Sequence, residues 1–353
     1  MRTDAHRPAR PARTAATLAG LAVLEPQSET TQRQALERLG LAGDEFAERI
    51  FSRSGVERRD LNLDAAFLQS NLEQRTAQVE QKLLDRSVKA IGRLQFDPEA
   101  VGAVLTSSLY SLGTPSLAQR LIEHYGLDPS IDKYHVTGAG CSSAVPLFRL
   151  ASQMLHSDPS REVLIVAAES MSSLFAPARA DNPRVRTVGA AIFGDGCGAA
   201  RLSARRGAAG PSILATAVHQ VPGTLAAVEV ACDEHGGFLQ LAPELPKIAG
   251  EQLAGLVERF LAENRVGEES IAHWMLHPGG RRIVEEARDA LGLHDDDVAI
   301  SWQALADHGN VGTPSIFYVI DATVRSRRPQ SGELGLAVTI GPGVSVGLML
   351  MRF

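Results

Sequence analysis

Cysteine is scarce in this chain, and long apolar segments are absent. Its only cysteines, Cys141, Cys197 and Cys232, form no Cys-x-x-Cys pair. This spacing argues against a zinc site or a disulfide framework, and it fits a reducing cytoplasm. No apolar run approaches the roughly 20 residues of a membrane-spanning helix. The net charge of −6 gives no indication of a nucleic acid or an anionic membrane as partner.

Acidic residues are also missing near the start of the chain, where only Asp4 precedes Glu25. Such an arginine- and alanine-rich beginning resembles a targeting peptide. The apolar stretch at 17–24 is short, however, and is better interpreted as the first strand of the fold. We therefore expect residues 1–15 to form a disordered leader.

The rest of the chain has the pattern of a globular α/β protein. Hydrophobic residues make up 44% and charged residues 22%, and 353 residues suffice for two domains or one large α/β domain. Apolar runs at 100–106 and 163–168 predict strands that are buried on both faces. Helical spacing of apolar residues occurs at 31–39, 44–53, 71–91 and 113–127.

The last of these helices has its own start and stop signals. Thr114 can cap it, Pro115 suits its first position, and Gly126 can end it. Strands that alternate with such helices predict a sheet covered by helices on both faces.

Two patterns occur twice, in the same order. Residues 190–202 and 337–350 each predict a strand, a Gly-x-Gly turn and a second strand. Cys141 and Asn310 each follow a glycine and precede a helical pattern with a proline in its first turn, where proline is tolerated. We therefore expect two halves of similar plan, which meet near residues 205–210.

Cys141 lies between a glycine-rich turn and a predicted helix. A thiol at a helix N-terminus faces unpaired N–H groups and the positive end of the helix dipole, and both stabilise a thiolate. Cysteine is also a common core residue, so this segment alone allows a nucleophile or an inert buried thiol. Cys197 and Cys232 precede no predicted helix.

A cysteine nucleophile needs a base or an ion-pair partner. His277 ends an apolar strand pattern and precedes a Pro-Gly-Gly turn and an amphipathic helix, and sites gather at strand ends in α/β sheets. His308 is the competing histidine. Asn310 stands at the start of a helix, where it could act as a cap or in the chemistry.

Together these residues resemble the type III polyketide synthases, the chalcone-synthase-like enzymes. The resemblance rests on Cys141 in Gly-x-Gly-Cys, His277 in His-Pro-Gly-Gly, Asn310 in His-Gly-Asn-Val-Gly, Gly-Asp-Gly at 194–196 and Gly-Pro-Gly at 341–343. The motifs occur in the family's order and with similar separations, and the resemblance extends from about residue 20 to the C-terminus.

The resemblance implies the α/β thiolase fold. Two similar βαβαβαβαββ halves form a five-layered α-β-α-β-α core in that fold, normally as a homodimer. Residues 16–205 would be the half that carries the nucleophile, and residues 206–353 the half that carries the histidine and the asparagine.

It also implies a decarboxylative condensation. Cys141 would take a starter acyl group from coenzyme A, and an ion pair with His277 would keep its thiolate reactive. His277 and Asn310 would hold the malonyl-CoA thioester carbonyl while decarboxylation generates an enolate. The enolate would attack the acyl thioester in repeated cycles that end in cyclisation. Coenzyme A thioesters are the direct substrates, so no cofactor or metal is expected.

Further positions are assigned to substrates by the resemblance alone. Phe193 matches an aromatic gatekeeper, Ser107 a cavity-lining residue, and Leu112 a residue that crosses the dimer interface. The loop that shapes the cavity matches Gly341, Pro342 and Gly343.

The resemblance also assigns residues that would contact coenzyme A. Arg49 and Arg53 match basic residues that meet its phosphates, although a solvated helix face would explain them as well. Gly280 and Arg282 would flank the pantetheine path. Phe46 stands where the plant enzymes have a third basic residue, which puts that contact in doubt.

The departures from the plant enzymes concern the starter. Leu239, beside Phe238, replaces a second gatekeeper phenylalanine, Gly312 replaces a serine, and Leu174 replaces a lining threonine. The first and second changes open space and the third narrows a wall. We therefore expect an aliphatic acyl starter that gives alkylpyrones or alkylresorcinols, with a malonyl-primed naphthalene-type product as the alternative.

Other interpretations of the same motifs compete with this one. A β-ketoacyl-[acyl carrier protein] synthase III has the same fold and trio, but it has a His-Gln-Ala-Asn-like sequence at its histidine and a shorter gap to its asparagine. A thiolase or a hydroxymethylglutaryl-CoA synthase fits less well. A non-catalytic partner subunit would commonly have lost the nucleophile, which is present here.

Overall fold

The structure is a computed structural model that describes residues 16–111, 113–175, 183–233 and 236–353. The expected leader at 1–15 and Leu112 therefore lie outside the described residues. Within these ranges no helix is both long enough and apolar enough to cross a membrane.

A nine-stranded sheet runs through the molecule in the order β11-β12-β13-β8-β1-β7-β6-β4-β5. Short two-stranded sheets pair β2 with β3 and β9 with β10. The strands are β1 Ala16–Val23, β2 Thr30–Thr31, β3 Arg58–Arg59, β4 Val101–Ser107, β5 Asp132–Val136, β6 Glu162–Glu169, β7 Gly196–Ser203, β8 Ser212–Gln220, β9 Val228–Asp233, β10 Gly236–Leu241, β11 Ile271–Leu276, β12 Leu334–Gly341 and β13 Ser345–Arg352.

The strand pairing repeats itself on the two sides of the sheet. On one side β1 is antiparallel to β7, β7 is antiparallel to β6, and β6 is parallel to β4. On the other side β8, β13, β12 and β11 pair in the same way, and β1 joins β8. The first side has a further edge strand, β5, for which the described part of the second side shows no counterpart, so the implied halves differ by this strand.

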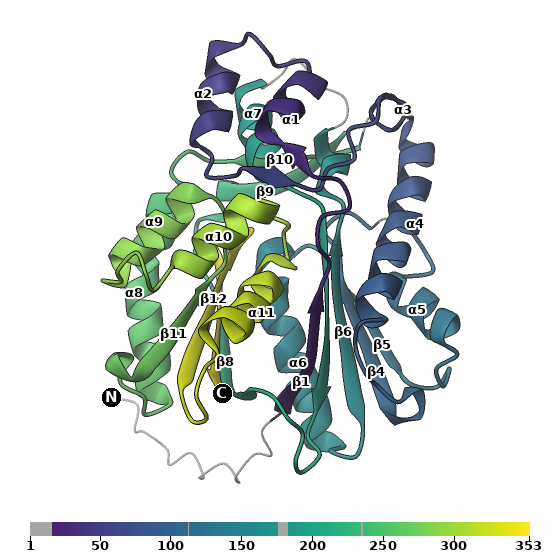
Figure 1. The fold of residues 1–353 in the computed structure, drawn as a ribbon, viewed down its shortest axis with the longest axis vertical. Coiled ribbons are helices and arrows are strands. Elements are labelled where there is room, and N and C mark those ends of the chain that lie inside the picture. Colours follow the sequence, from purple (N-terminus) through teal and green to yellow (C-terminus); the bar gives the residue numbers. More distant parts are fainter. Residues whose placement is uncertain (1–15, 112, 176–182, 234–235) are drawn as a thin grey trace.

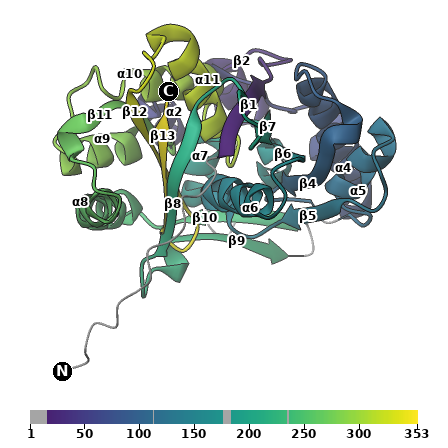
Figure 2. The same ribbon diagram turned by 90° about the horizontal axis from the view of Figure 1, so that it is seen from below.

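The helices complete five layers, α-β-α-β-α (Figure 1; Figure 2). One outer layer contains α4 and α5, the other contains α8, α9 and α10, and α6 and α11 lie between the two parts of the sheet. The helices are α1 Gln32–Arg38, α2 Glu45–Arg53, α3 Ala65–Leu68, α4 Leu72–Ile91, α5 Leu117–Tyr125, α6 Ala144–Ser157, α7 Pro183–Ile192, α8 Leu245–Glu263, α9 Arg281–Ala290, α10 Ala299–His308 and α11 Ser315–Arg327.

The expected division near residues 205–210 falls in the connection between β7 and β8. The repeated pairing agrees with two similar halves, and their boundaries at 16–205 and 206–353 stay an interpretation.

Most predicted elements are present, and two details of the prediction are wrong. The strand pair at 337–350 is confirmed as β12 and β13, and Gly126, with φ of 60°, ends α5. However, α5 begins after Ser116, whose backbone N–H donates to the Gln119 side chain at 3.0 Å, so Thr114 and Pro115 precede the helix.

The other error is at 190–202, where the first predicted strand is the last turn of α7. Helical bonding continues to Phe193, whose N–H donates to the Gly189 carbonyl at 2.9 Å. A short apolar run fits either a helix or a strand, and here the helix is formed.

The central helices pack against each other and against the opposite side of the sheet. Phe148 of α6 and Phe317 of α11 have ring centroids 5.3 Å apart. A Cβ atom at Gly198 of β7 would lie 2.9 Å from Cβ of Phe317, and one at Gly347 of β13 would lie 2.9 Å from Cβ of Val145. Glycine in the last strand of each side thus permits the close approach of a central helix.

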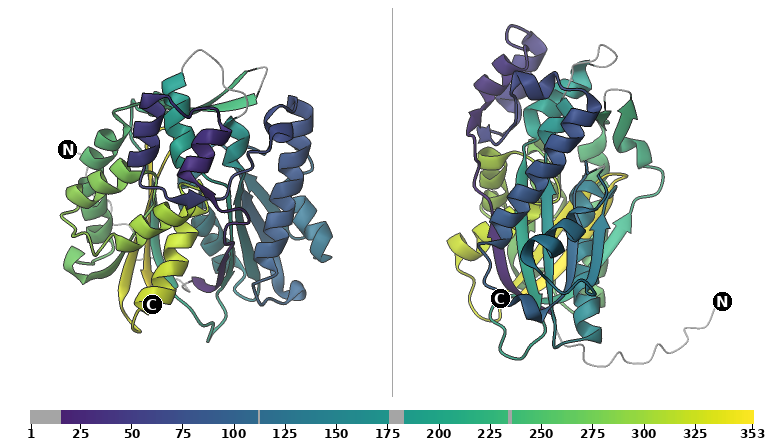
Figure 3. Two further views of the ribbon diagram at one scale, coloured as in Figure 1. Left: turned by 45° about the horizontal axis from the view of Figure 1, so that its top comes forward. Right: turned by 90° about the vertical axis from the view of Figure 1, so that its right-hand side faces the viewer.

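A separate cap lies over one end of the central strands (Figure 1; Figure 3). It consists of α1, α2, α7 and the β9–β10 pair, with α7 in contact with both α2 and β10. The cap forms the roof over the site described below.

A matched pair of glycine substitutions tests the packing. Gly198→Ala should lower the free energy of unfolding by about 1–3 kcal/mol, because the added methyl group overlaps Phe317. Gly255→Ala in α8 meets only the end of the Arg259 side chain and should raise it by about 0.5–1 kcal/mol. Denaturant unfolding measures both, and a stabilised Gly198→Ala variant would contradict this packing.

Candidate active site

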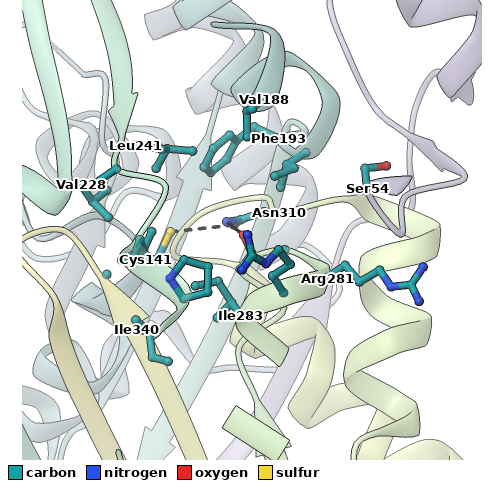
Figure 4. A pocket seen from close by; sticks show the side chains of 18 of the residues that line it. Ser54, Cys141, Val188, Phe193, Val228, Leu241, Arg281, Ile283, Asn310 and Ile340 are labelled. Carbon is teal, nitrogen blue, oxygen red and sulfur yellow. Dashed lines mark hydrogen bonds between the residues drawn. The ribbon is translucent and has the colours of Figure 1, made fainter. Parts of the chain in front are cut away.

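Cys141, His277 and Asn310 border one cavity of about 580 Å³ beneath the cap (Figure 4). They come from the turn before α6, from the end of β11, and from the segment between α10 and α11. The structure therefore brings together the three residues that the sequence singles out.

Glycine is required in the turn that carries Cys141. Gly140 has φ of 47°, and a Cβ atom there would lie 2.8 Å from Cγ of Pro342. A Cβ atom at Gly341 would lie 2.5 Å from the Ser142 nitrogen. The Gly-Pro-Gly loop thus packs directly against the turn that positions the thiol.

Asn310 is held by its main chain and by its side chain. Its N–H donates to the Ile192 carbonyl at 2.9 Å, and its carbonyl accepts the Gly194 N–H at 3.0 Å. Its Oδ1 accepts the Gly312 N–H at 2.9 Å, and its Nδ2 donates to the Gly279 carbonyl at 3.1 Å. These bonds fix the amide orientation beside Cys141, whose Sγ lies 3.8 Å from Oδ1.

The capping interpretation of Asn310 is wrong. The residue that precedes α11 is Pro314, four positions further along the chain. Asn310 instead lies in a short bridge with Phe193, in contact with the cavity.

His277 is only 3% exposed, and its backbone N–H donates to the Val338 carbonyl at 2.8 Å. Both ring nitrogens are buried and have no hydrogen-bond partner among the described residues. A Cβ atom at Gly279 would lie 3.3 Å from the ring Cδ2, so the Pro-Gly-Gly turn packs closely against the imidazole. Burial lowers the pKa of His277 to about 3, so the ring is neutral near pH 7.

Cys141 is held in the neutral form as well. Burial raises the pKa of its thiol to about 12, the charge of Glu169 adds to this, and the Asn310 contact opposes it. Burial disfavours the charge on each partner of the Cys141–His277 ion pair that the resemblance implies, and the pair itself stays a prediction.

Glu169 at the end of β6 is a buried carboxyl group behind the site. Its Oε2 accepts the Leu109 N–H at 2.8 Å, and burial raises its pKa to about 8. A Cβ atom at Gly312 would lie 3.1 Å from its Cγ. Sequence reasoning missed Glu169, although a charged residue that ends a buried apolar strand is itself a signal.

Neither His308 nor Cys197 borders the cavity with Cys141. The His308 ring packs on Tyr318 with centroids 4.5 Å apart and does not line the cavity. Cys197 is fully buried in β7 beside the Tyr318 hydroxyl. The Cys232 side chain lies outside the described residues. Across the described ranges no group of His, Cys, Asp and Glu could hold a metal ion.

The cavity walls are mostly apolar. Of the predicted substrate positions, Phe193, Gly341 and Pro342 line them. The apolar side chains that sequence reasoning missed are Ile50, Leu109, Met171, Val188, Ile192, Val228, Leu241, Ala242, Pro243, Leu245, Pro246, Ile283 and Ile340.

Other predicted positions are set back from the cavity or are not described. Ser107, Leu174 and Gly312 are buried and do not line it. Gly343, with φ of 63°, lies in the turn before β13. The Leu239 side chain and Leu112 lie outside the described residues.

Only some of the residues predicted to contact coenzyme A line the cavity. Arg53, Gly280 and Arg282 line the cavity, as does Arg281, which the sequence did not single out. Arg49 is exposed and does not line the cavity. Its guanidinium lies 5.7 Å from the centre of the Phe46 ring.

Comparisons with known proteins identify the family of this chain. A family model of FAE1 and type III polyketide synthase-like proteins matches residues 23–261. A model of the C-terminal domain of chalcone and stilbene synthases matches residues 213–353. The crystal structure of PKS-I from the brown alga Ectocarpus siliculosus covers 96% of this chain and 98% of its own, with a TM-score of 0.87 and 25% identity.

Individual relatives include a 3,5-dihydroxyphenylacetyl-CoA synthase of Streptomyces toyocaensis, 26% identical over 92% of this chain and 86% of that protein. A 1,3,6,8-tetrahydroxynaphthalene synthase of Streptomyces peucetius subsp. caesius is 29% identical over 72% and 67%. An alpha-pyrone synthesis polyketide synthase-like protein of Mycobacterium tuberculosis is 26% identical over 76% and 69%. Since the first family model alone matches more than half of the chain, this protein belongs to the type III polyketide synthases, which are acyl-condensing enzymes.

Proposed function

We propose that this synthase loads an aliphatic acyl group from coenzyme A onto Cys141, extends it with malonyl-CoA, and cyclises the product to an alkylpyrone or alkylresorcinol. The observation that carries this proposal is the apolar cavity beside Cys141, which α7, β9 and β10 line with aliphatic side chains such as Val188, Val228 and Leu241. Burial of methylene groups contributes about 0.8 kcal/mol each, so a longer aliphatic chain gains affinity there.

A malonyl-primed product is the second candidate. The similarity to a tetrahydroxynaphthalene synthase supports it, whereas the similarity to an alpha-pyrone synthesis protein supports the first. The two differ in whether a separate aliphatic starter is required.

Loading begins from a neutral thiol and a neutral imidazole. As the Cys141 sulfur attacks the acyl-CoA carbonyl, His277 takes the thiol proton. The new S–C bond replaces the bond to coenzyme A, which leaves as a thiol with the proton from His277. Its lowered pKa makes His277 a weak base. For the same reason, protonated His277 readily gives the proton to the leaving coenzyme A sulfur.

Extension of the chain requires hydrogen-bond donors to the thioester oxygen and no charged catalytic side chain. A neutral His277 ring and the Asn310 Nδ2 group can each donate an N–H to the malonyl thioester oxygen. The carboxylate leaves as CO₂, and its bonding electrons form an enolate that these donors stabilise. The enolate carbon then attacks the Cys141 thioester and the S–C bond breaks, so the sulfur leaves as a thiolate. It takes up a proton from water before the next acyl group is loaded.

A homodimer belongs to the same proposal. The strand β5 is an unpaired edge of the large sheet, and Tyr134 on it is 46% exposed. Such an edge can pair with a second copy, which would cover the tyrosine. The position of Leu112 at that interface, and the cytoplasm as compartment, stay predictions.

Product analysis tests the function. The purified protein is given malonyl-CoA with acetyl, hexanoyl, long-chain or aromatic CoA starters, and products are identified by mass spectrometry. We expect alkylpyrones or alkylresorcinols from aliphatic starters and none from Cys141→Ala, which lacks the nucleophile. Product from malonyl-CoA alone would favour the second candidate. A single condensation that requires malonyl-[acyl carrier protein] would favour the fatty-acid initiation enzyme.

A substitution in the cavity wall tests the starter class. Val228→Phe should shorten the space for the acyl chain and lower kcat/KM for long-chain starters by about tenfold, with little effect on acetyl-CoA. Val324→Phe is the matched control, since Val324 is 40% exposed on α11. An equal loss for all starters would contradict an acyl-binding role of this wall.

The protonation state of Cys141 predicts its pH dependence. With its pKa raised to about 12, the thiolate fraction should grow about tenfold per pH unit throughout the range from pH 6 to 9. The rate of alkylation by iodoacetamide, followed by mass spectrometry, should rise accordingly, and His277→Gln should leave this slope unchanged. A rate that is already constant above pH 6 would instead indicate a preformed ion pair.

A further inference from the structure

Three arginines line the cavity, whose walls are mostly apolar. Arg53 is in the last turn of α2, and Arg281 and Arg282 are the first two residues of α9. All three line the cavity, whereas no aspartate or glutamate of the described chain does. We call these residues the arginine rim.

Packing between α2 and α9 places the rim on one side of the cavity. Gly55, just after α2, has φ of 82°, and a Cβ atom there would lie 3.3 Å from Cβ of Arg281. Figure 4 shows Ser54 and Arg281 on one side of the cavity and Cys141 on the other. A ligand that spans the cavity can therefore reach the thiol with one end and the rim with the other.

Most of the positive charge at this rim comes from α9. On the α2 side the lining residues are Phe46, Ile50, Arg53 and Ser54, so α2 contributes a single charged side chain. Arg49, one turn before Arg53, lies over the Phe46 ring instead.

The first turn of α9 is itself short of negative charge. Its N-cap residue, Gly280, offers no side-chain cap, and the first turn has no acidic residue. Two arginines at the positive end of a helix dipole are unfavourable, and the carboxylate of Glu285, which pairs with Arg281, offsets one of these two charges. Arg281 donates its Nε–H to Glu285 at 2.9 Å, which orients the guanidinium and leaves its two Nη groups at the far end of the side chain.

We propose that Arg281 binds a phosphate group of the coenzyme A thioester, so that α9 provides the main anchor for the nucleotide end of the substrate. A guanidinium binds phosphate through two parallel N–H bonds, with Glu285 holding it in place. The inference rests on the proposed function only in taking coenzyme A thioesters as substrates.

The test separates phosphate recognition from the chemistry. Arg281→Ala is compared with the wild type on malonyl-CoA and on the malonyl thioester of N-acetylcysteamine, which has the same reacting group and no phosphate. We expect kcat/KM for malonyl-CoA to fall about tenfold through KM, with kcat unchanged, and no change for the truncated thioester. Arg288→Ala, on the same helix but paired with Asp289 and Asp295, should change neither value.

A direct binding measurement tests the role of Arg281 even if no turnover is observed. Calorimetry should show free coenzyme A binding about tenfold more weakly to Arg281→Ala than to the wild type, and this holds whatever reaction the enzyme catalyses. Phe46→Lys in the Arg281→Ala background should restore part of the affinity by returning a cation to the α2 side. Equal losses on both thioesters, or unchanged affinity for coenzyme A, would overturn the role of Arg281.

Discussion

The contact between α6 and α11 determines the geometry of the active site. These helices come from the two sides of the sheet, and their phenylalanine rings, Phe148 and Phe317, meet in the middle layer. Their preceding turns carry Cys141 and Asn310, and the Thr313 hydroxyl donates to the Gly140 carbonyl at 2.8 Å. Residues that are far apart in the chain are thereby held within reach of one acyl group.

Glycines make this close packing possible. Gly198 and Gly347 admit the two helices onto the sheet, and Gly140 and Gly341 admit the cavity loop onto the nucleophile turn. A side chain at any of these positions would overlap atoms of the neighbouring segment. The catalytic geometry therefore depends on the absence of side chains as much as on the reactive ones.

Burial then sets the charge state of the site. The pKa of Cys141 is raised and that of His277 is lowered, each chiefly by the loss of water. A neutral imidazole is suited to donate an N–H to an enolate oxygen, and the raised pKa of Glu169 reduces negative charge near the same point. In the proposed function, the apolar cavity thus serves both the binding of an acyl chain and the stabilisation of a developing anion.

The sequence identifies the reactive residues better than their surroundings. Glycines and strand ends mark Cys141, His277 and Asn310 as candidates, and the resemblance to the family selects them over their alternatives. Residues 190–192 are helical because they pack against α1 and α2 within the cap, so their short apolar run misleads. Arg281 gains its place from its contact with Gly55, more than two hundred residues earlier, and no local pattern reveals such a contact. The pKa shifts of Cys141 and His277 are hard to predict from sequence for a similar reason, because desolvation is a property of the assembled cavity.

The separate cap has a consequence for how this enzyme can diversify. The proposed catalytic residues lie on the sheet and before the central helices, and Asn310 is also bonded to the end of α7, whereas β9 and β10 contribute wall that an acyl chain would touch. Mutations in β9 and β10 can therefore alter which carbon skeletons fit without changing the bonds that hold Asn310. Evolution and protein engineering can therefore vary the acyl-binding wall at β9 and β10 while the geometry around Cys141 is kept.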